Sequence, residues 1–241
     1  MSVPKDRTIG RLLDRARRSG RCSLTEPETR EILSLAGIST PRERLVRSAA
    51  EAVKAAQELG FPVVMKVVSP DIPHKSDIGG VKLGLKSPEA VRSAYREILA
   101  SVGKHCATAS VEGILVQETV QGLEVILGTM TDPQFGPVLM FGLGGVFVEA
   151  LDDVAFRVIP ITNDDAREIL NGIRGTALLD GYRGSPPANR KDLAGVLMKL
   201  SDLAGRFHDS IREIDINPLV VTANRSVAVD GLMTLYEGNP V

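Results

Sequence analysis

The stretch Pro62–Val81, PVVMKVVSPDIPHKSDIGGV, decides how the rest of the chain is organised. Its first part is an apolar run rich in β-branched residues and bounded by prolines, which is typical of a buried strand. Lys66 lies in the middle of this run, and a buried lysine needs a partner because its ammonium group loses hydration. Two interpretations stay open. Lys66 pairs with a distant carboxylate or a bound anion, or it lies on an edge strand and extends to water.

The loop that follows this predicted strand carries His74, Lys75, Ser76, Asp77 and the pair Gly79-Gly80. Cations, a histidine and flexible glycines beside a lysine-bearing strand suit the binding of phosphate groups. The stretch therefore predicts a strand and a loop that together handle phosphate.

The composition limits the class of protein. The chain has 241 residues, of which 43% are hydrophobic and 24% charged, as in an ordinary globular protein with a real core. A net charge of −1 and the absence of Trp disfavour nucleic acid and membrane surfaces as partners. Cys22 and Cys106 have no metal-ligand spacing and are expected to be reduced thiols. With neither a secretory signal nor a bilayer-spanning run in view, we expect a cytoplasmic protein.

Capping signals and periodicity predict a mixture of helices and strands without regular alternation. Helices are expected within residues 6–19, 25–37, 48–59, 87–102, 163–171 and 190–207. Strands are expected at 63–68, 81–85, 114–118, 124–130, 138–141, 146–151, 154–159, 211–221 and 227–230. The run of consecutive strands predicts antiparallel pairing, and the fold class is α+β. We expect a helical extension at 1–23, a first lobe at 24–118 and a second lobe at 119–241.

A candidate metal site lies near the end of the chain. In the segment EIDINPL the residues Glu213, Asp215 and Asn217 alternate with apolar residues, so they share one face of a strand. If residues 222–225 form the connecting loop, Asn217 lies directly opposite Asp230. Oxygen ligands gathered on one face favour a hard cation such as Mg²⁺. The alternative is an ordinary solvated strand face, which does not explain Asp230 in an apolar run.

Two further segments are candidates for binding a nucleotide. The glycine loop within Phe141–Glu149 includes Gly144 and Gly145, whose backbone N–H groups could approach phosphates, although a tight hairpin would use the same glycines. The loop opens no helix, so it is not a dinucleotide fingerprint. Gln117 and Glu118 end a predicted strand at the lobe boundary, where a hinge could hydrogen-bond an adenine edge.

Taken together, these motifs resemble the ATP-grasp β subunit of ADP-forming acyl-CoA synthetases (acetate–CoA ligase, ADP-forming), a family related to succinyl-CoA synthetase. The resemblance covers about Leu24–Leu235 and rests on motifs in the same order: Val63–Lys66, Ser69–Val81, Asp132–Pro137, Phe141–Glu149 and Glu213–Pro218. It implies an ATP-grasp fold, with the nucleotide held between two α+β lobes. It also implies an acid–thiol ligase that reversibly converts acyl-CoA, ADP and phosphate into acid, CoA and ATP.

The resemblance further implies ATP or ADP and Mg²⁺ as cofactors. The implied partner is a CoA-binding α subunit that carries a phosphohistidine, in a hetero-oligomer of two α and two β subunits. The nucleotide itself would be bound by Lys66 at the phosphates, by Glu124 near the ribose, and by a hinge at the adenine made of Gln117, Glu118 and Val120.

The remaining roles implied by the resemblance concern the reaction. Asn217 and Asp230 would bind Mg²⁺, Asp215 would assist phosphoryl transfer, and His74 would carry a phosphoryl group between the nucleotide site and the α subunit. Arg157 would help to neutralise phosphate charge. The chain departs from the family pattern at Gly231-Leu232, where many relatives have Ala-Arg, so a contact by that arginine is not expected here.

Two other functions remain open at this point. One is a regulatory module that binds nucleotide without turnover, which would not need His74 or the metal residues. The other is an ATP-grasp ligase that joins a carboxylate to an amine and works without a partner.

Overall fold

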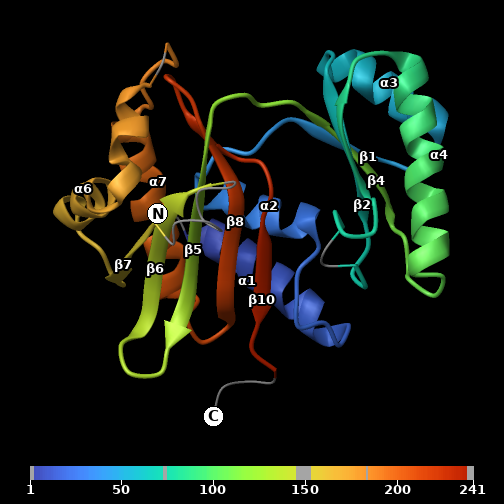
Figure 1. Ribbon diagram of the computed structural model, residues 1–241. Helices are drawn as coiled ribbons and strands as arrows, with labels where there is room; N and C mark the ends of the chain where they lie inside the picture. Colours follow the sequence, from blue (N-terminus) through green and yellow to red (C-terminus); the bar gives the residue numbers. More distant parts are fainter. Residues whose placement is uncertain (1–2, 73–74, 145–152, 183, 238–241) are drawn as a thin grey trace. The chain divides into compact units, whose positions relative to one another are not determined.

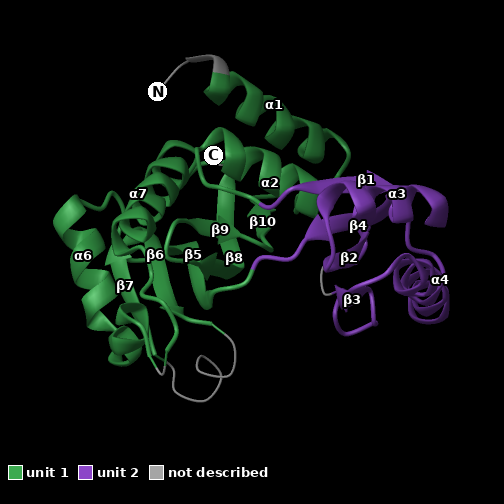
Figure 2. Ribbon diagram, turned by 90° about the horizontal axis from the view of Figure 1, so that it is seen from above, with its two compact units in different colours: residues 1–40, 121–241 green, residues 41–120 purple. Residues whose placement is uncertain are grey.

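The computed structural model describes residues 3–72, 75–144, 153–182 and 184–237. The chain divides into two compact units, which Figure 2 shows in different colours: residues 41–120 form one, and residues 1–40 together with 121–241 form the other.

The unit of residues 41–120 is a four-stranded antiparallel sheet with two helices on one face (Figure 1). Its elements are β1 (Glu43–Val46), α3 (Ala49–Leu59), β2 (Val63–Val68), β3 (Val81–Leu85), α4 (Pro88–His105) and β4 (Gly113–Glu118). Both helices begin as predicted, since Ser48 and Ser87 accept hydrogen bonds from the backbone N–H groups of Glu51 and Ala90. Apolar side chains of α3 and α4 pack with Val63, Met65 and Val67 of β2 into one core.

Lys66 lies in the interior of this sheet. The strand order is β1-β4-β2-β3, so β2 has a neighbour on each side and the edge-strand interpretation is wrong. Met65 and Val67 face the helix-covered core, and Lys66 therefore points to the opposite face. Its side chain is buried, with 4% exposed. A lysine in a central strand fits the interpretation in which the ammonium group has an anionic partner.

The described residues 75–80 of the loop after β2 form a tight turn built on glycines. Gly80 donates to the carbonyl of Lys75 at 2.7 Å and accepts from the N–H of Val67 at 2.9 Å. A Cβ at Gly80 would lie 2.7 Å from the side chain of Val67, so only glycine fits this approach. The hydroxyl of Ser101 on α4 donates to the carbonyl of Ile78 at 2.5 Å. The loop is thus fixed to both β2 and α4.

The other unit is built on a six-stranded antiparallel sheet with the order β10-β8-β5-β6-β7, in which β9 pairs with β8 (Figure 1). Its strands are β5 (Leu123–Asp132), β6 (Gly136–Leu143), β7 (Val154–Val158), β8 (Ile211–Val221), β9 (Ser226–Ala228) and β10 (Leu232–Leu235). Its helices are α1 (Val3–Arg18), α2 (Glu26–Leu35), α6 (Asn163–Gly172), the 3₁₀ helix η1 (Arg174–Asp180) and α7 (Arg190–Arg206). The antiparallel meander expected for the second half is confirmed.

Residues 1–40 belong to the unit of the six-stranded sheet, whereas the sequence predicted a separate extension at 1–23 and a first lobe that begins at residue 24. The reason is the burial of apolar side chains. Ile9 and Leu13 of α1 and Ile32 of α2 lie in one core with Leu127 of β5. The boundary between residues 120 and 121 lies two residues after the expected one between 118 and 119.

Two short strands, β1 and β10, were not predicted. Each is four residues long. Each forms by pairing with a longer strand, β4 for β1 and β8 for β10, and its own residue types give little sign of a strand. The strand predicted at 146–151 lies outside the described residues. In the part of the chain that the structure describes, no helix has the length and apolar character needed to cross a bilayer.

Candidate functional site

The six-stranded sheet has one face covered by helices and one face that carries the predicted acidic residues. Ile214 and Ile216 of β8 lie in the core, so Glu213, Asp215 and Asn217 point to the other face, as predicted. The register pairs Asp215 with Gly128 of β5. Because a glycine stands opposite it, Asp215 has no bulky neighbour on that side of β8.

Asn217 and Asp230 lie opposite each other, as the predicted hairpin requires. The β8–β9 register pairs Leu219 with Ala228 and Val221 with Ser226, and continuing it by two residues from Leu219 reaches Asn217 and Asp230. The backbone N–H of Asn217 donates to the carbonyl of Asp230 at 3.3 Å. Two side chains with oxygen ligands are therefore held side by side by the backbone itself.

Asp215 sits in an environment that disfavours its negative charge. Burial raises the pKa of its carboxyl, and the charges of Glu213 and Asp230 raise the pKa further. Leu232 of β10 lies in register with Asp215, so an apolar residue stands beside it where many relatives were expected to have arginine. A cation bound at Asp230 would relieve this repulsion between like charges.

Asn217 and Asp230 suit a magnesium ion that arrives bound to a nucleotide better than they suit a preformed metal centre. Among the described residues, no three His, Cys, Asp or Glu side chains are close enough to hold a metal ion. Mg²⁺ is usually bound through one or two carboxylates together with waters and substrate phosphates, and it does not require an all-protein cage. Asn217 and Asp230 supply such a partial set of ligands.

The glycine loop approaches Glu124, the residue expected near the ribose. The backbone N–H of Gly144 donates to the carbonyl of Glu124 at 2.8 Å. A Cβ at Gly144 would lie 2.9 Å from the carbonyl carbon of Glu124, so the two backbones pack too closely for any other residue. The side chain of Glu124 is exposed. Two predicted nucleotide-binding residues are thus brought together, while Gly145 lies outside the described residues.

Two side chains of the expected hinge are hydrogen-bonded to Glu43 of β1 and to Arg42, the residue before it. Gln117 is fully buried, and its Nε2 donates to Glu43 Oε2 at 3.3 Å. The carboxylate of Glu118 accepts from Arg42 Nε at 2.7 Å, and the backbone N–H of Glu118 donates to the carbonyl of Arg42. The adenine contacts expected of Gln117, Glu118 and Val120 stay a prediction.

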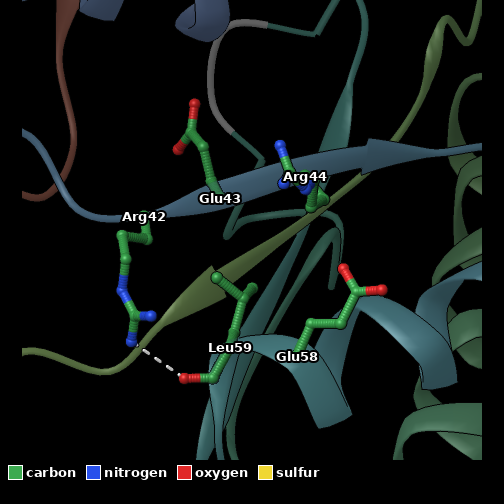
Figure 3. Close-up of a pocket in the computed structure, with 5 residues that line it drawn as sticks. All are labelled: Arg42, Glu43, Arg44, Glu58 and Leu59. Atoms are coloured by element: carbon green, nitrogen blue, oxygen red, sulfur yellow. Dashed lines mark hydrogen bonds between the residues drawn. The ribbon is translucent and has the colours of Figure 1, made fainter.

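A pocket of about 310 Å³ lies on the same unit as this hinge segment, lined by Arg42, Glu43, Arg44, Glu58 and Leu59. Figure 3 shows the guanidinium group of Arg42 turned toward the carbonyl of Leu59, with a hydrogen bond of 2.9 Å between them. The lining mixes arginine with glutamate, and Arg42 is also paired with Glu118. The pocket therefore presents no net charge that would select a phosphate.

Arg157 does not lie on the face of Asp215. It is paired in register with Leu139, which belongs to the helix-covered core, whereas its neighbours Phe156 and Val158 point to the other face. Its guanidinium group contacts Glu168 of α6 at 3.3 Å. The expectation that Arg157 neutralises phosphate charge at this site is therefore not supported, because the strand directs it to the wrong side of the sheet.

Comparison with known proteins identifies the family. The family model described as an ATP-grasp domain matches residues 15–235 of this chain. The β subunit of ADP-forming acetate–CoA ligase I from Pyrococcus furiosus is 45% identical over 225 residues, which cover 93% of this chain and 96% of that protein. The chain belongs to the ATP-grasp family of ADP-forming acetate–CoA ligase β subunits. The predicted α+β ATP-grasp fold and the resemblance in the sequence are thereby confirmed.

Solved structures of this family include bound nucleotide analogues. The dinucleotide-forming acetyl-coenzyme A synthetase 1 of Ca. Korarchaeum cryptofilum, in complex with coenzyme A, Ca-AMPCP and HgCl⁺, matches with a TM-score of 0.89 and 43% identity over 93% of this chain and 98% of that chain. The same enzyme with coenzyme A and Mg-AMPPCP has its phosphohistidine segment pointing towards the nucleotide binding site. That structure matches with a TM-score of 0.81 and 41% identity over 95% of this chain and 100% of that chain.

In this ATP-grasp chain the structure also shows polar residues that sequence reasoning missed. Arg30 of α2 is buried, forms an ion pair with Glu26 and donates to the carbonyl of Val229 at 2.7 Å. Burial lowers the pKa of Arg30 to about 10, and the nearby carboxylate of Asp230 opposes that shift. A Glu–Arg pair four residues apart looks in sequence like a surface pair on a helix, so only the packing of α2 could reveal it.

Asp153 is a second buried residue that was missed. Its two carboxylate oxygens accept hydrogen bonds of 2.6 and 2.7 Å from the backbone N–H groups of Arg174 and Gly175. This satisfies the free donors at the start of η1 and gives Asp153 a structural role.

The predicted residues thus fall into three groups. Asp215, Asn217 and Asp230 come together on one sheet, and Glu124 contacts Gly144 on the same unit. Lys66, Gln117, Glu118 and Val120 belong to the unit of residues 41–120. His74 lies outside the described residues.

Proposed function

We propose that the chain is the nucleotide-binding β subunit of an ADP-forming acetyl- or acyl-CoA synthetase. It works with a CoA-binding α subunit that carries a phosphohistidine, in an assembly of two α and two β subunits in the cytoplasm. The net reaction is acyl-CoA + ADP + phosphate to acid + CoA + ATP. The observation that carries the proposal is the pairing of Asn217 with Asp230 on the strand face of Asp215.

The proposal assigns nucleotide binding to both units. Lys66 contacts the phosphates, because its cationic group is buried in a central strand where an anion offsets the loss of hydration. Glu124 and Gly144 bind near the ribose and phosphates, and Val120 contributes to the adenine hinge through its backbone. Asn217 and Asp230 hold Mg²⁺, which when bound neutralises phosphate charge during transfer.

Phosphoryl transfer requires little covalent chemistry from these groups. In the direction of ATP formation the phosphoryl group is transferred twice. The P–N bond of the α-subunit phosphohistidine breaks as a P–N bond forms to His74, and the P–N bond of His74 then breaks as a bond forms to the terminal phosphate oxygen of ADP. His74 relays the phosphoryl group because a neutral imidazole is nucleophilic near pH 7. Asp215 assists the transfer from the strand face that it shares with Asn217, where burial raises the pKa of its carboxyl.

Reconstitution tests this function directly. The full-length chain is combined with the CoA-binding α subunit, and ATP formation is measured from acetyl-CoA, ADP and phosphate. We expect activity with both subunits, none with either alone, and a loss of more than about 100-fold in His74→Ala, as for removal of a nucleophile.

Other outcomes would contradict the proposal in different ways. Undiminished activity of His74→Ala would overturn the relay. Nucleotide binding without acyl-CoA chemistry would point to a regulatory module. Amide formation by the chain alone would identify a carboxylate–amine ligase.

A further inference from the structure

A buried ion pair on α2 has no part in the roles proposed so far. Glu26 and Arg30 lie one helical turn apart, and their side chains are 1% and 3% exposed. A pair buried this deeply is rarely more stabilising than apolar residues of similar size, because both charges lose their hydration. Its position therefore suggests a role other than holding α2 in the core.

Arg30 reaches from α2 to the main chain beside the candidate metal ligand. Its Nη2 donates a hydrogen bond of 2.7 Å to the carbonyl oxygen of Val229. Val229 directly precedes Asp230, so this carbonyl belongs to the peptide group that leads into Asp230. Fixing that planar group fixes the point from which the carboxylate of Asp230 extends.

The opposing strand offers this carbonyl no backbone N–H. The β8–β9 register places Pro218 opposite Val229, and the N–H of Val229 donates to the carbonyl of Pro218 at 3.0 Å. A hydrogen-bonded pair in an antiparallel ladder normally exchanges two bonds, but proline has no N–H to donate in return. The guanidinium group of Arg30 supplies the donor that Pro218 lacks.

We propose that Arg30, held by Glu26, is a positioning residue for the metal site of Asn217 and Asp230. Arg30 donates to the carbonyl of Val229, the residue that follows β9. It also places a fixed positive charge near the carboxylate of Asp230. This role rests on the proposed function, since it requires that Asn217 and Asp230 bind the metal of the nucleotide.

Metal affinity gives the decisive measurement. The full-length chain is titrated with Mn²⁺ in the presence of ADP, and free Mn²⁺ is followed by electron paramagnetic resonance. We expect Arg30→Met to weaken Mn²⁺ binding about tenfold or more, as for other residues that support metal ligands. Arg30→Lys keeps the charge beside Glu26 but loses the planar fork, so its affinity is expected to fall between those of wild type and Arg30→Met.

Arg21→Met is the matched control. Arg21 also forms an ion pair with a glutamate of α2, at 2.7 Å from Glu28. Its removal is expected to change Mn²⁺ affinity by less than about twofold, as for a substitution away from the site.

A second readout needs no metal. The backbone N–H of Gly231 donates to Asp230 Oδ1 at 2.8 Å, so its hydrogen exchange reports the order of this segment. The exchange of Gly231 is expected to accelerate in Arg30→Met and to stay unchanged in Arg21→Met.

Asp230→Asn separates a failure of this role from a failure of the proposed function. If Asp230→Asn abolishes Mn²⁺ binding while Arg30→Met and Arg21→Met bind Mn²⁺ equally well, the metal site stands and the role of Arg30 is overturned. If Asp230→Asn binds Mn²⁺ like wild type, the metal assignment is wrong and the role of Arg30 is lost with it. If Arg30→Met does not fold, Arg30→Lys decides: Mn²⁺ affinity and Gly231 exchange equal to those of wild type overturn the proposal.

Discussion

The two sheets of the molecule carry opposite charges at the positions where their sequences depart from apolar patterning. In the four-stranded sheet the exception is Lys66, a buried cation in the central strand β2. In the six-stranded sheet the exceptions are Glu213 and Asp215 on β8, with Asp230 nearby. Burial raises the pKa of Asp215 and so disfavours its charge, and a buried lysine such as Lys66 requires an anionic partner. In the proposed function, the phosphates of the nucleotide would be the anionic partner of Lys66, and its metal would be the cationic partner of Asp230.

The largest expected effect comes from removing the cation of the four-stranded sheet. Lys66→Met keeps most of the side-chain volume and deletes the charge, so ATP formation in the reconstituted enzyme should fall about 10²–10³-fold. ADP affinity, measured by calorimetry, should fall both with and without Mg²⁺, because the lysine is expected to contact phosphate and not metal.

Lys82→Met is the control for Lys66→Met. Lys82 lies on the neighbouring strand β3 and pairs with Glu97 at 2.7 Å. Its replacement should leave ADP affinity unchanged. If Lys66→Met and wild type bind ADP equally well, Lys66 has a structural role only. The contrast between a phosphate-binding cation in one sheet and metal-binding carboxylates in the other would then be wrong.

A smaller effect is expected at Glu28, which links α1 and α2 within the unit of the six-stranded sheet. Burial alone would raise the pKa of Glu28, but the bonds from Arg21, Thr25 and Arg15 outweigh it and lower the pKa to about 2. Glu28→Gln should reduce the free energy of unfolding at neutral pH by about 1–2 kcal/mol, because the neutral amide loses the charged hydrogen bonds with Arg15 and Arg21.

The pH dependence gives the sign of this effect. A carboxyl whose pKa is lowered in the folded state stabilises the protein above its ordinary pKa of 4.5 and loses that contribution as the pH falls toward 2. The difference between wild type and Glu28→Gln in urea unfolding should therefore shrink over this range. Glu31→Gln, an exposed change on the same helix, is the control variant. A constant difference at all pH values would show that Glu28 acts by packing alone.

Sequence reasoning predicted local features well, because each depends on residues close in the chain. The capping box of α2 and the helix starts at Ser48, Ser87 and Thr162 follow from short spacings, although Ser48 forms an N-cap without the full box expected with Glu51. The opposition of Asn217 and Asp230 followed from counting a four-residue loop, and the observed register confirms it.

Features that depend on long-range packing could not be predicted in this way. The alternation in β7 shows that Arg157 and Phe156 point to opposite faces, but not which face the helices cover. The assignment of residues 1–40 to the six-stranded sheet depends on α1 and α2 packing against strands far along the chain. The contact of Arg30 with Val229 spans 199 residues and leaves no local signal.

Asp215 offers a test of the acidic half of the comparison. Burial, Glu213 and Asp230 raise its pKa in the folded state, so the unfolded state releases its proton first as the pH rises. Stability contributed by the protonated carboxyl is therefore present below its unfolded pKa of about 3.9 and lost as the pH rises through the folded pKa. In the metal-free protein, Asp215→Asn should raise the free energy of unfolding at neutral pH by up to about 1 kcal/mol.

The pH profile of thermal unfolding checks the prediction for Asp215. The gain from Asp215→Asn should disappear toward pH 4, and Mg²⁺ with ADP should stabilise wild type more than the variant. If Asp215→Asn is less stable than wild type at neutral pH, the carboxylate of Asp215 has a compensating partner. Its charge would then not destabilise the folded protein.

The smallest effect is expected at Arg157, and it sharpens the distinction between the two faces of the six-stranded sheet. Arg157 contacts Glu168 on the helix side, at the protein surface. Arg157→Met should change the free energy of unfolding by less than about 0.5 kcal/mol, because exposed ion pairs contribute little. ADP affinity and ATP formation should stay within about twofold of wild type, since the side chain points away from the face of Asp215. A loss of ATP formation comparable to that of Lys66→Met would mean that phosphate is bound from the helix side. The metal and the phosphates would then lie on opposite faces of the sheet, which one nucleotide cannot span.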